Sequence, residues 1–146
     1  GPKGEFFAQR RAQHSVTYLP NDNTVTTGRY QVLLYDNNFG AAESYPKFDW
    51  GQLGAAVVTD YSKGTHSFGH IFTVDENART YELEDQVAVP FSGYVSSAQR
   101  VGDSDSMLVA SGQAKTFTEY DRYGLPIATY EMEAEKYIYR VYKYEL

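Results

Sequence analysis

Short runs of alternating apolar and polar residues, separated by turn-forming residues, follow one another along the chain. Alternation with a period of two is typical of strands with one buried face, and no window of about 12 residues has the apolar spacing of an amphipathic helix. The pattern predicts roughly ten strands, at residues 15–19, 30–35, 55–61, 69–74, 80–84, 95–101, 106–111, 116–121, 125–132 and 137–144. We therefore expect residues 1–146 to form a single all-β unit.

Turn-forming residues mark the ends of the first two predicted strands. Pro20 to Asn23 follows the first strand, and Asp36 to Gly40 follows the second. Proline fixes its own φ, and Asn and Asp tolerate left-handed backbone conformations, so both segments favour turns. The pattern predicts a hairpin whose polar end, at residues 36–40, is exposed.

The strand, turn, strand pattern of residues 16–35 recurs at residues 95–111, about 80 positions later. Such repetition is typical of antiparallel propeller blades, here about two four-stranded blades plus a closing strand at 137–144. It is equally compatible with a small closed antiparallel β-barrel that binds a small ligand. A third interpretation is a non-catalytic fragment whose sheet edges pair with other chains.

Composition narrows the possible functions. The chain has 146 residues, of which 42% are hydrophobic, which suits one compact core. The 14 tyrosines and 8 phenylalanines favour strands over helices. The absence of cysteine excludes disulfide frameworks, thiolate zinc sites and thiol catalysis. A net charge of −6 argues against nucleic acid or an anionic membrane as partner.

Histidine is the only side chain that titrates near neutral pH, and the chain has three. His14 stands beside Gln13 immediately before a predicted strand, where it is either an ordinary strand-end histidine or a nucleophile or base. His66 and His70 lie near glycines without metal-ligand spacing, so we expect no metal site. No phosphate-binding glycine loop occurs either, and no cofactor is expected. Arg100 and Arg140 lie in or beside predicted strands, where the usual reasons for a guanidinium are an ion pair, which is favoured here, or an anionic ligand.

The residues around His14 resemble a known family. The run Gln13-His14-Ser15-Val16-Thr17-Tyr18-Leu19-Pro20-Asn21, followed by residues 32–38, is similar to a segment of bacterial arylsulfate sulfotransferases, as are residues 91–99 and the pair Tyr139-Arg140. The resemblance runs from about Phe6 to the end of the chain. It implies that the chain is the C-terminal part of a larger, six-bladed propeller.

The same resemblance implies the chemistry. Family members transfer a sulfuryl group from an aryl sulfate donor to a phenolic acceptor without a nucleotide, and by position His14 corresponds to the histidine that is transiently sulfated. A neutral imidazole is a competent nucleophile for such a two-step transfer. We expect Gln13 to orient His14 by hydrogen bonding, and Tyr94, Ser96 and Arg140 to line the substrate channel.

The chain begins Gly1-Pro2, and Phe6-Phe7 follow directly, so we expect a piece of a longer protein. The family's other catalytic histidines and arginine lie on earlier blades, and the isolated chain is expected to have little or no activity. Its open sheet edges predict pairing with chains that complete the propeller, or a homo-oligomer. Residues 137–144 should accordingly pair with a distant strand or another chain. Family members are exported, which implies a periplasmic or secreted location.

Overall fold

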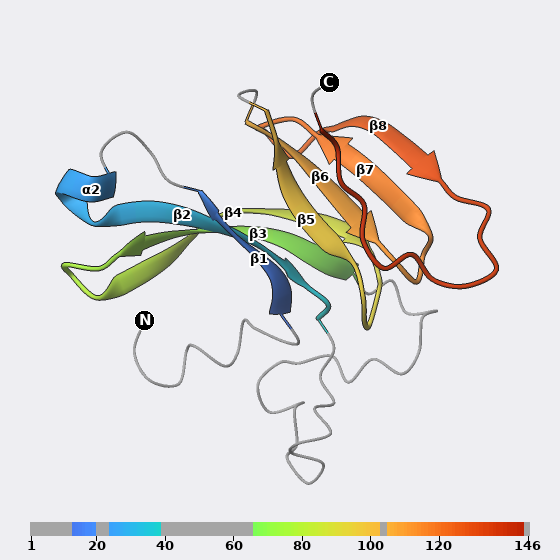
Figure 1. Cartoon of the computed structure of the whole chain (residues 1–146), viewed down its shortest axis with the longest axis horizontal. Helices are drawn as coiled ribbons and strands as arrows, with labels where there is room; N and C mark the ends of the chain where they lie inside the picture. The colour runs from blue at the N-terminus through green and yellow to red at the C-terminus, as the bar shows by residue number, and fades with distance from the viewer. Residues whose placement is uncertain (1–12, 20–23, 39–65, 103–104, 145–146) are drawn as a thin grey trace, which may run out of the picture.

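Two four-stranded antiparallel sheets form the protein. The structure is a computed structural model, and it describes residues 13–19, 24–38, 66–102 and 105–144. The sheets have the strand orders β1-β2-β3-β4 and β5-β6-β7-β8, so every neighbour in space is also a neighbour in sequence (Figure 1). This simple meander is the topology of propeller blades. Within the described residues the sheets do not close into a barrel, so the barrel alternative was wrong.

The first sheet contains four of the predicted strands or their extensions. Its strands are β1 (Gln13–Leu19), β2 (Arg29–Asp36), β3 (His66–Asp75) and β4 (Thr80–Pro90), and the short helix α2 (Thr24–Thr27) precedes β2. The apolar alternation did not predict α2, because four residues are too few to show a helical period. The predicted strand at 55–61 lies outside the described residues.

The second sheet contains the next four predicted strands. They are β5 (Ser97–Val101), β6 (Ser106–Ser111), β7 (Thr116–Tyr120) and β8 (Pro126–Glu131). Residues 137–144, predicted as a closing strand, form no regular strand. They nevertheless lie along β5, about forty positions away in sequence, through hydrogen bonds such as Ser96 N to Tyr139 O at 3.1 Å. The segment thus contacts residues distant in sequence, but the prediction of a paired strand was wrong: the contacts are made largely by side chains, and β5 belongs to the second sheet rather than to an earlier blade.

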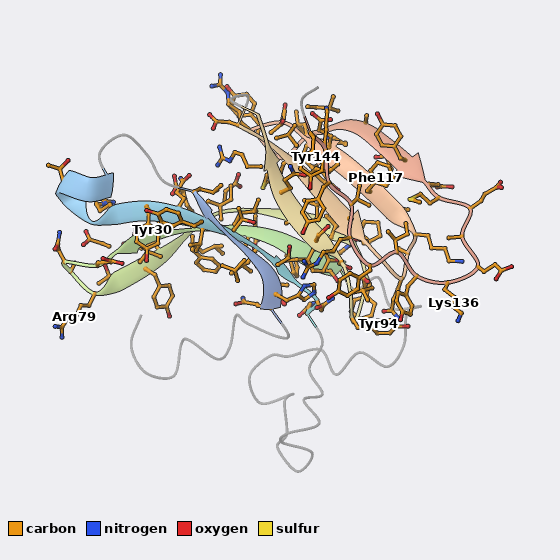
Figure 2. All side chains as sticks on the ribbon, in the orientation of Figure 1. Tyr30, Arg79, Tyr94, Phe117, Lys136 and Tyr144 are labelled. Atoms are coloured by element: carbon orange, nitrogen blue, oxygen red, sulfur yellow. The ribbon has the colours of Figure 1, made fainter. Side chains whose placement is uncertain are left out.

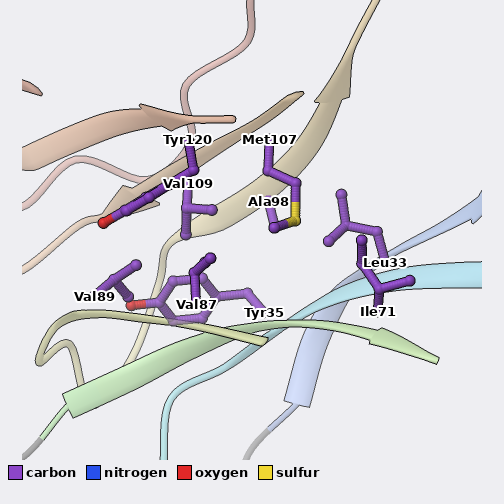
Figure 3. Close-up of a cluster of buried hydrophobic side chains, with 9 residues drawn as sticks. All are labelled: Leu33, Tyr35, Ile71, Val87, Val89, Ala98, Met107, Val109 and Tyr120. Atoms are coloured by element: carbon purple, nitrogen blue, oxygen red, sulfur yellow. The ribbon is translucent and has the colours of Figure 1, made fainter. Parts of the chain in front are cut away.

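The core lies between the two sheets, where alternate residues of facing strands interdigitate. Figure 3 shows Met107 and Ala98 of the second sheet opposite Leu33 and Ile71 of the first. The nine core side chains are Leu33, Tyr35, Ile71, Val87, Val89, Ala98, Met107, Val109 and Tyr120. Full burial of one large aliphatic side chain stabilises a fold by about 1.5–3 kcal/mol. This shared core fixes one sheet against the other.

The polar end of β2 is buried, which corrects the prediction of an exposed hairpin end. Asp36 is 2% exposed and Asn37 is 1% exposed. The Asn37 amide donates to the carbonyl oxygens of Ser92, at 2.6 Å, and Val95, at 3.2 Å. Buried polar groups are stable only where they find hydrogen-bond partners. Here those partners come from the segment that leads into the second sheet.

Candidate functional site

His14 is the second residue of β1 and lies beside the end of β2; in Figure 1 the start of β1 lies towards the middle of the molecule's long axis. It pairs with Tyr35 across the two strands, and the two ring centroids are 5.5 Å apart. The register of β1 against β2 shifts between His14 and Thr17, and Ser15 has a φ of 56°. A bulge of this kind breaks the alternation of side chains and re-aims those beside it. The irregularity thus falls next to the histidine.

The His14 imidazole is half-buried, and this burial lowers its pKa below the usual 6.5. The positive charge of Arg140 lowers the pKa further, whereas the Asn37 side chain, the Val95 carbonyl and the Asp36 charge act in the opposite direction. The imidazole is therefore neutral at pH 7. Its Nε2 atom is buried and has no hydrogen-bond partner within the described part of the chain. Such unsatisfied atoms are rare in folded proteins and are a feature of reactive sites.

The side chain of Gln13 hydrogen-bonds to the Asp36 carboxylate. Its amide Nε2 donates to Asp36 Oδ2 at 3.1 Å, in place of the expected hydrogen bond to His14. The other carboxylate oxygen accepts from the backbone N–H of Asn38 at 2.7 Å, and His70 Nε2 lies 3.4 Å from Asp36 Oδ2. Both members of the Asp36–His70 pair are buried. Sequence analysis gave His70 no role, because only the pairing of β2 with β3 brings it to Asp36.

The other three predicted site residues come from the segments that meet beside His14. Tyr94 is 51% exposed, and its ring stands perpendicular to that of Tyr137 with centroids 5.4 Å apart (Figure 2). Arg140 is exposed, with its guanidinium 5.0 Å from the Tyr139 ring centroid. The positive charge of Arg140 lowers the pKa of His14, and the preceding residue, Tyr139, accepts a hydrogen bond from Ser96 N at 3.1 Å.

Ser96 is 1% exposed, and its hydroxyl is already engaged. The hydroxyl donates to Ser92 Oγ at 2.9 Å and accepts from the Gly112 backbone N–H at 2.9 Å. Both Val95, at φ 57°, and Ser96, at φ 91°, occupy the left-handed region that L side chains rarely adopt. Strain of this kind persists only where surrounding contacts over-determine the backbone, and it concentrates at functional sites.

Sequence analysis also missed a buried serine network behind the site. Ser67 Oγ donates to the Asn37 carbonyl at 3.1 Å and accepts from the Ser92 backbone N–H at 2.9 Å. Ser92 Oγ in turn accepts from Gln113 N at 3.0 Å. Serines near strand ends have the pattern of ordinary turn residues, so the sequence alone does not indicate that their hydroxyls form a buried network. Among the described residues, no group of three His, Asp or Glu side chains could hold a metal ion.

The family model for arylsulfotransferase (ASST) matches residues 2–142, which is nearly the whole chain. The chain belongs to the arylsulfotransferase family. No curated protein matches it. Membership in the arylsulfotransferase family identifies sulfuryl transfer as the reaction class of the complete enzyme and aryl sulfates as its substrate class. The family assignment does not depend on any single residue of the site.

Proposed function

We propose that this chain supplies the nucleophile of an aryl sulfotransferase, and that His14 is that nucleophile. The observation that carries the proposal is the state of the His14 imidazole. Burial lowers its pKa, and its buried Nε2 has no hydrogen-bond partner among the described residues. A neutral imidazole with an unengaged nitrogen keeps the lone pair that nucleophilic attack requires. His70 also has a buried ring nitrogen without a partner among the described residues, Nδ1, but its Nε2 lies 3.4 Å from the Asp36 carboxylate. His66 Nδ1 lies 3.3 Å from the Val89 carbonyl.

The reaction proceeds in two displacements. In the first, an imidazole nitrogen forms a bond to sulfur while the bond from sulfur to the aryl oxygen breaks, and the donor leaves as a phenolate that takes up a proton from solvent. In the second, the acceptor phenol loses its proton to solvent and its oxygen bonds to sulfur. The nitrogen–sulfur bond then breaks, and the lone pair returns to the imidazole. Two such steps replace one more difficult transfer.

Charge stabilisation during transfer needs more than this chain. The sulfuryl oxygens are anionic throughout, and preorganised cationic groups or donors lower the barrier. Arg140 is the cation that lies beside His14, and Tyr94 offers an exposed aromatic ring for an aryl group. Ser96 shapes the wall of the site through its backbone rather than through a free hydroxyl. We infer that the remaining donors belong to other blades, so that this chain alone turns over little or no substrate.

The same proposal extends to partners and location. The donor is an aryl sulfate and the acceptor a phenol, and no cofactor takes part. Further blades, or another copy of the chain, cover the open sheet edges. We place the complete enzyme outside the cytoplasm, in the periplasm or secreted, because the bacterial arylsulfate sulfotransferases that the chain resembles are exported.

Intact-protein mass spectrometry tests the nucleophile. The complete enzyme is exposed to an aryl sulfate without acceptor, as wild type and as His14→Ala, with His66→Ala as the matched control because His66 is an exposed histidine. We expect a sulfuryl adduct in the wild type and the control, mapping to His14, and none in His14→Ala. An adduct in His14→Ala, or one that maps elsewhere, overturns the assignment.

Turnover by the isolated chain is a separate test. This chain is incubated with an aryl sulfate and a phenol, and sulfated product is measured against the complete enzyme. We expect at most trace product. Turnover that depends on His14 in a homogeneous sample of the chain alone would contradict the inference that other blades supply necessary donors.

A further inference from the structure

The C-terminal tail, residues 132–144, is held against the second sheet by side chains of β5. These side chains make the hydrogen bonds to the tail backbone that the backbone of a neighbouring strand would otherwise make. Ser97 Oγ accepts from Val141 N at 3.1 Å and donates to Val141 O at 3.3 Å. Gln99 Oε1 accepts from Lys143 N at 2.9 Å, and Gln99 Nε2 donates to Lys143 O at 2.8 Å. Two side chains on one face of β5 thus satisfy both backbone groups of two alternate tail residues.

The tail runs along the length of the second sheet. Figure 2 places Tyr94 and Tyr144 at opposite ends of that sheet, with the tail between them. Ile138 N donates to Gly112 O at 2.9 Å, and Lys143 Nζ lies 2.8 Å from Glu119 Oε2. At the start of the tail, Met132 N donates to Lys115 O at 2.9 Å, so the tail is anchored at its start, its middle and its end.

Arg140 stands between two of these anchored residues. Tyr139 O accepts from Ser96 N at 3.1 Å, and Val141 is bound by Ser97. The backbone of Arg140 is consequently fixed on both sides. Its guanidinium lies over the Tyr139 ring, and Nη1 is 3.4 Å from Tyr142 Oη. Both aromatic partners belong to the tail, so the guanidinium moves with the tail.

The anchors also connect to the histidine. Ser96 follows Val95, whose carbonyl lies beside the imidazole and accepts from the Asn37 amide at 3.2 Å. A tail that detached from β5 would carry Arg140 away from His14, while β1 and β2 would keep the imidazole in place.

We propose that Ser97 and Gln99 are positioning residues, which hold the tail so that the Arg140 guanidinium stays beside His14, where it receives the anionic sulfuryl group. The inference rests on the proposed function of His14 and adds to it the part of the fold that fixes the cation. Neither residue touches the reacting atoms; both act through the tail. Within the part of the chain that the structure describes, the guanidinium and Asp36 are the charged groups that act on the imidazole, and the Tyr35 phenol ring packs against it.

The test separates positioning from stability. Gln99→Leu keeps the size of the side chain and removes both hydrogen bonds to Lys143. Gln86→Leu, at an exposed position of β4, is the matched control. Titration of labelled histidines by NMR in this chain, with His14 assigned from His14→Gln, gives the pKa of His14 in each variant.

The expected result follows from the charge of Arg140. Because that charge lowers the pKa of His14, Arg140→Gln raises it. Gln99→Leu also raises the pKa of His14. The double variant, Gln99→Leu with Arg140→Gln, raises this pKa no further than Arg140→Gln alone, because Gln99 acts only through Arg140. Gln86→Leu leaves the pKa at the wild-type value. A Gln99→Leu protein that melts at a lower temperature but keeps the wild-type pKa of His14 overturns the proposal, as does an Arg140→Gln protein without a rise.

Lys143→Pro removes one of the same hydrogen bonds from the side of the tail, because proline lacks the N–H that donates to Gln99 Oε1. If Gln99→Leu does not fold, Lys143→Pro replaces it in the titration, and we expect Lys143→Pro to raise the pKa of His14 as well. The NMR titration requires no turnover. Failure of the adduct experiment therefore overturns the proposed function alone, and an unchanged pKa overturns the positioning role alone.

Discussion

The Tyr35 phenol and the Ser111 hydroxyl, which are 76 positions apart in sequence, lie 3.2 Å apart and join the two sheets. Tyr35 belongs to β2 and Ser111 ends β6. Burial raises the pKa of the Tyr35 phenol, so it keeps its proton at all ordinary pH values. The contact is therefore a neutral hydrogen bond inside the core, behind the ring of His14.

Tyr35→Phe removes this link while leaving the packing of the ring. We expect the free energy of unfolding to fall by about 1–2 kcal/mol, because the Ser111 hydroxyl loses a buried partner. Chemical denaturation of the chain measures the change. Tyr130→Phe, on the exposed face of β8, is the control and should stay within about 0.5 kcal/mol of wild type. Equal effects of the two changes would contradict the importance of the buried link.

Gly112, in the turn between β6 and β7, lies directly against the tail. A Cβ built on Gly112 would lie 2.1 Å from the Ile138 carbonyl oxygen and 2.5 Å from a methyl group of Val95. Gly112→Ala must therefore displace backbone, and we expect a loss of about 1–3 kcal/mol, the usual cost of overpacking. Thermal or chemical unfolding measures it, with Ala114→Ser in the same exposed turn as the control. Wild-type stability of Gly112→Ala would show that the tail does not pack as described.

Asp36 is the buried charge of the site. Asp36→Ala removes the acceptor of the Gln13 amide and of Asn38 N, together with the partner of His70. We expect the free energy of unfolding to fall by about 3 kcal/mol, since breaking a buried pair leaves the other group without compensation. Glu82→Ala, on the exposed face of β4, should cost less than about 0.5 kcal/mol. A similar small cost at Asp36 would mean that water replaces its partners.

The pH dependence of stability should contain a contribution from His14. Its folded-state pKa lies below the usual 6.5, so as pH falls through 6.5 the unfolded chain takes up a proton before the folded chain does. This contribution to stability is constant above pH 6.5 and is lost as pH falls towards the folded-state pKa. Denaturation at several pH values between about 5 and 8 should therefore give a smaller slope for His14→Gln than for wild type. Identical slopes would show that burial does not depress this pKa.

Much of the fold could be predicted from the alternation of apolar residues alone. Leu33 with Tyr35, and Met107 with Val109, stand two positions apart and share a buried face, which is what a period of two predicts. The ion pair expected for Arg100 forms with Asp105, its near neighbour in sequence. Local pattern succeeds in these cases because burial of one strand face, and pairing across a short turn, depend on residues close together in the chain.

The same alternation wrongly predicted a regular strand in the tail. Tyr137, Tyr139 and Val141 alternate with other residues as in a strand, yet the tail forms no regular ladder. Its backbone groups at Val141 are taken by the Ser97 side chain, 44 positions earlier. Similarly, Asp36 reads as a turn residue, and its burial depends on partners that include His70 of another strand. No local pattern contains such contacts.

The sequence by itself determined the eight strands of the two sheets, the family and the presence of a histidine beside Gln13 at the start of a strand. Only the tertiary structure decided the chemical state of that histidine. The pKa of His14 depends on its burial and on Asn37, Val95 and Arg140, which come from three separate segments. Desolvation and charge act through space over a few ångströms, so a group's protonation follows from what the fold places around it and not from its neighbours in the chain.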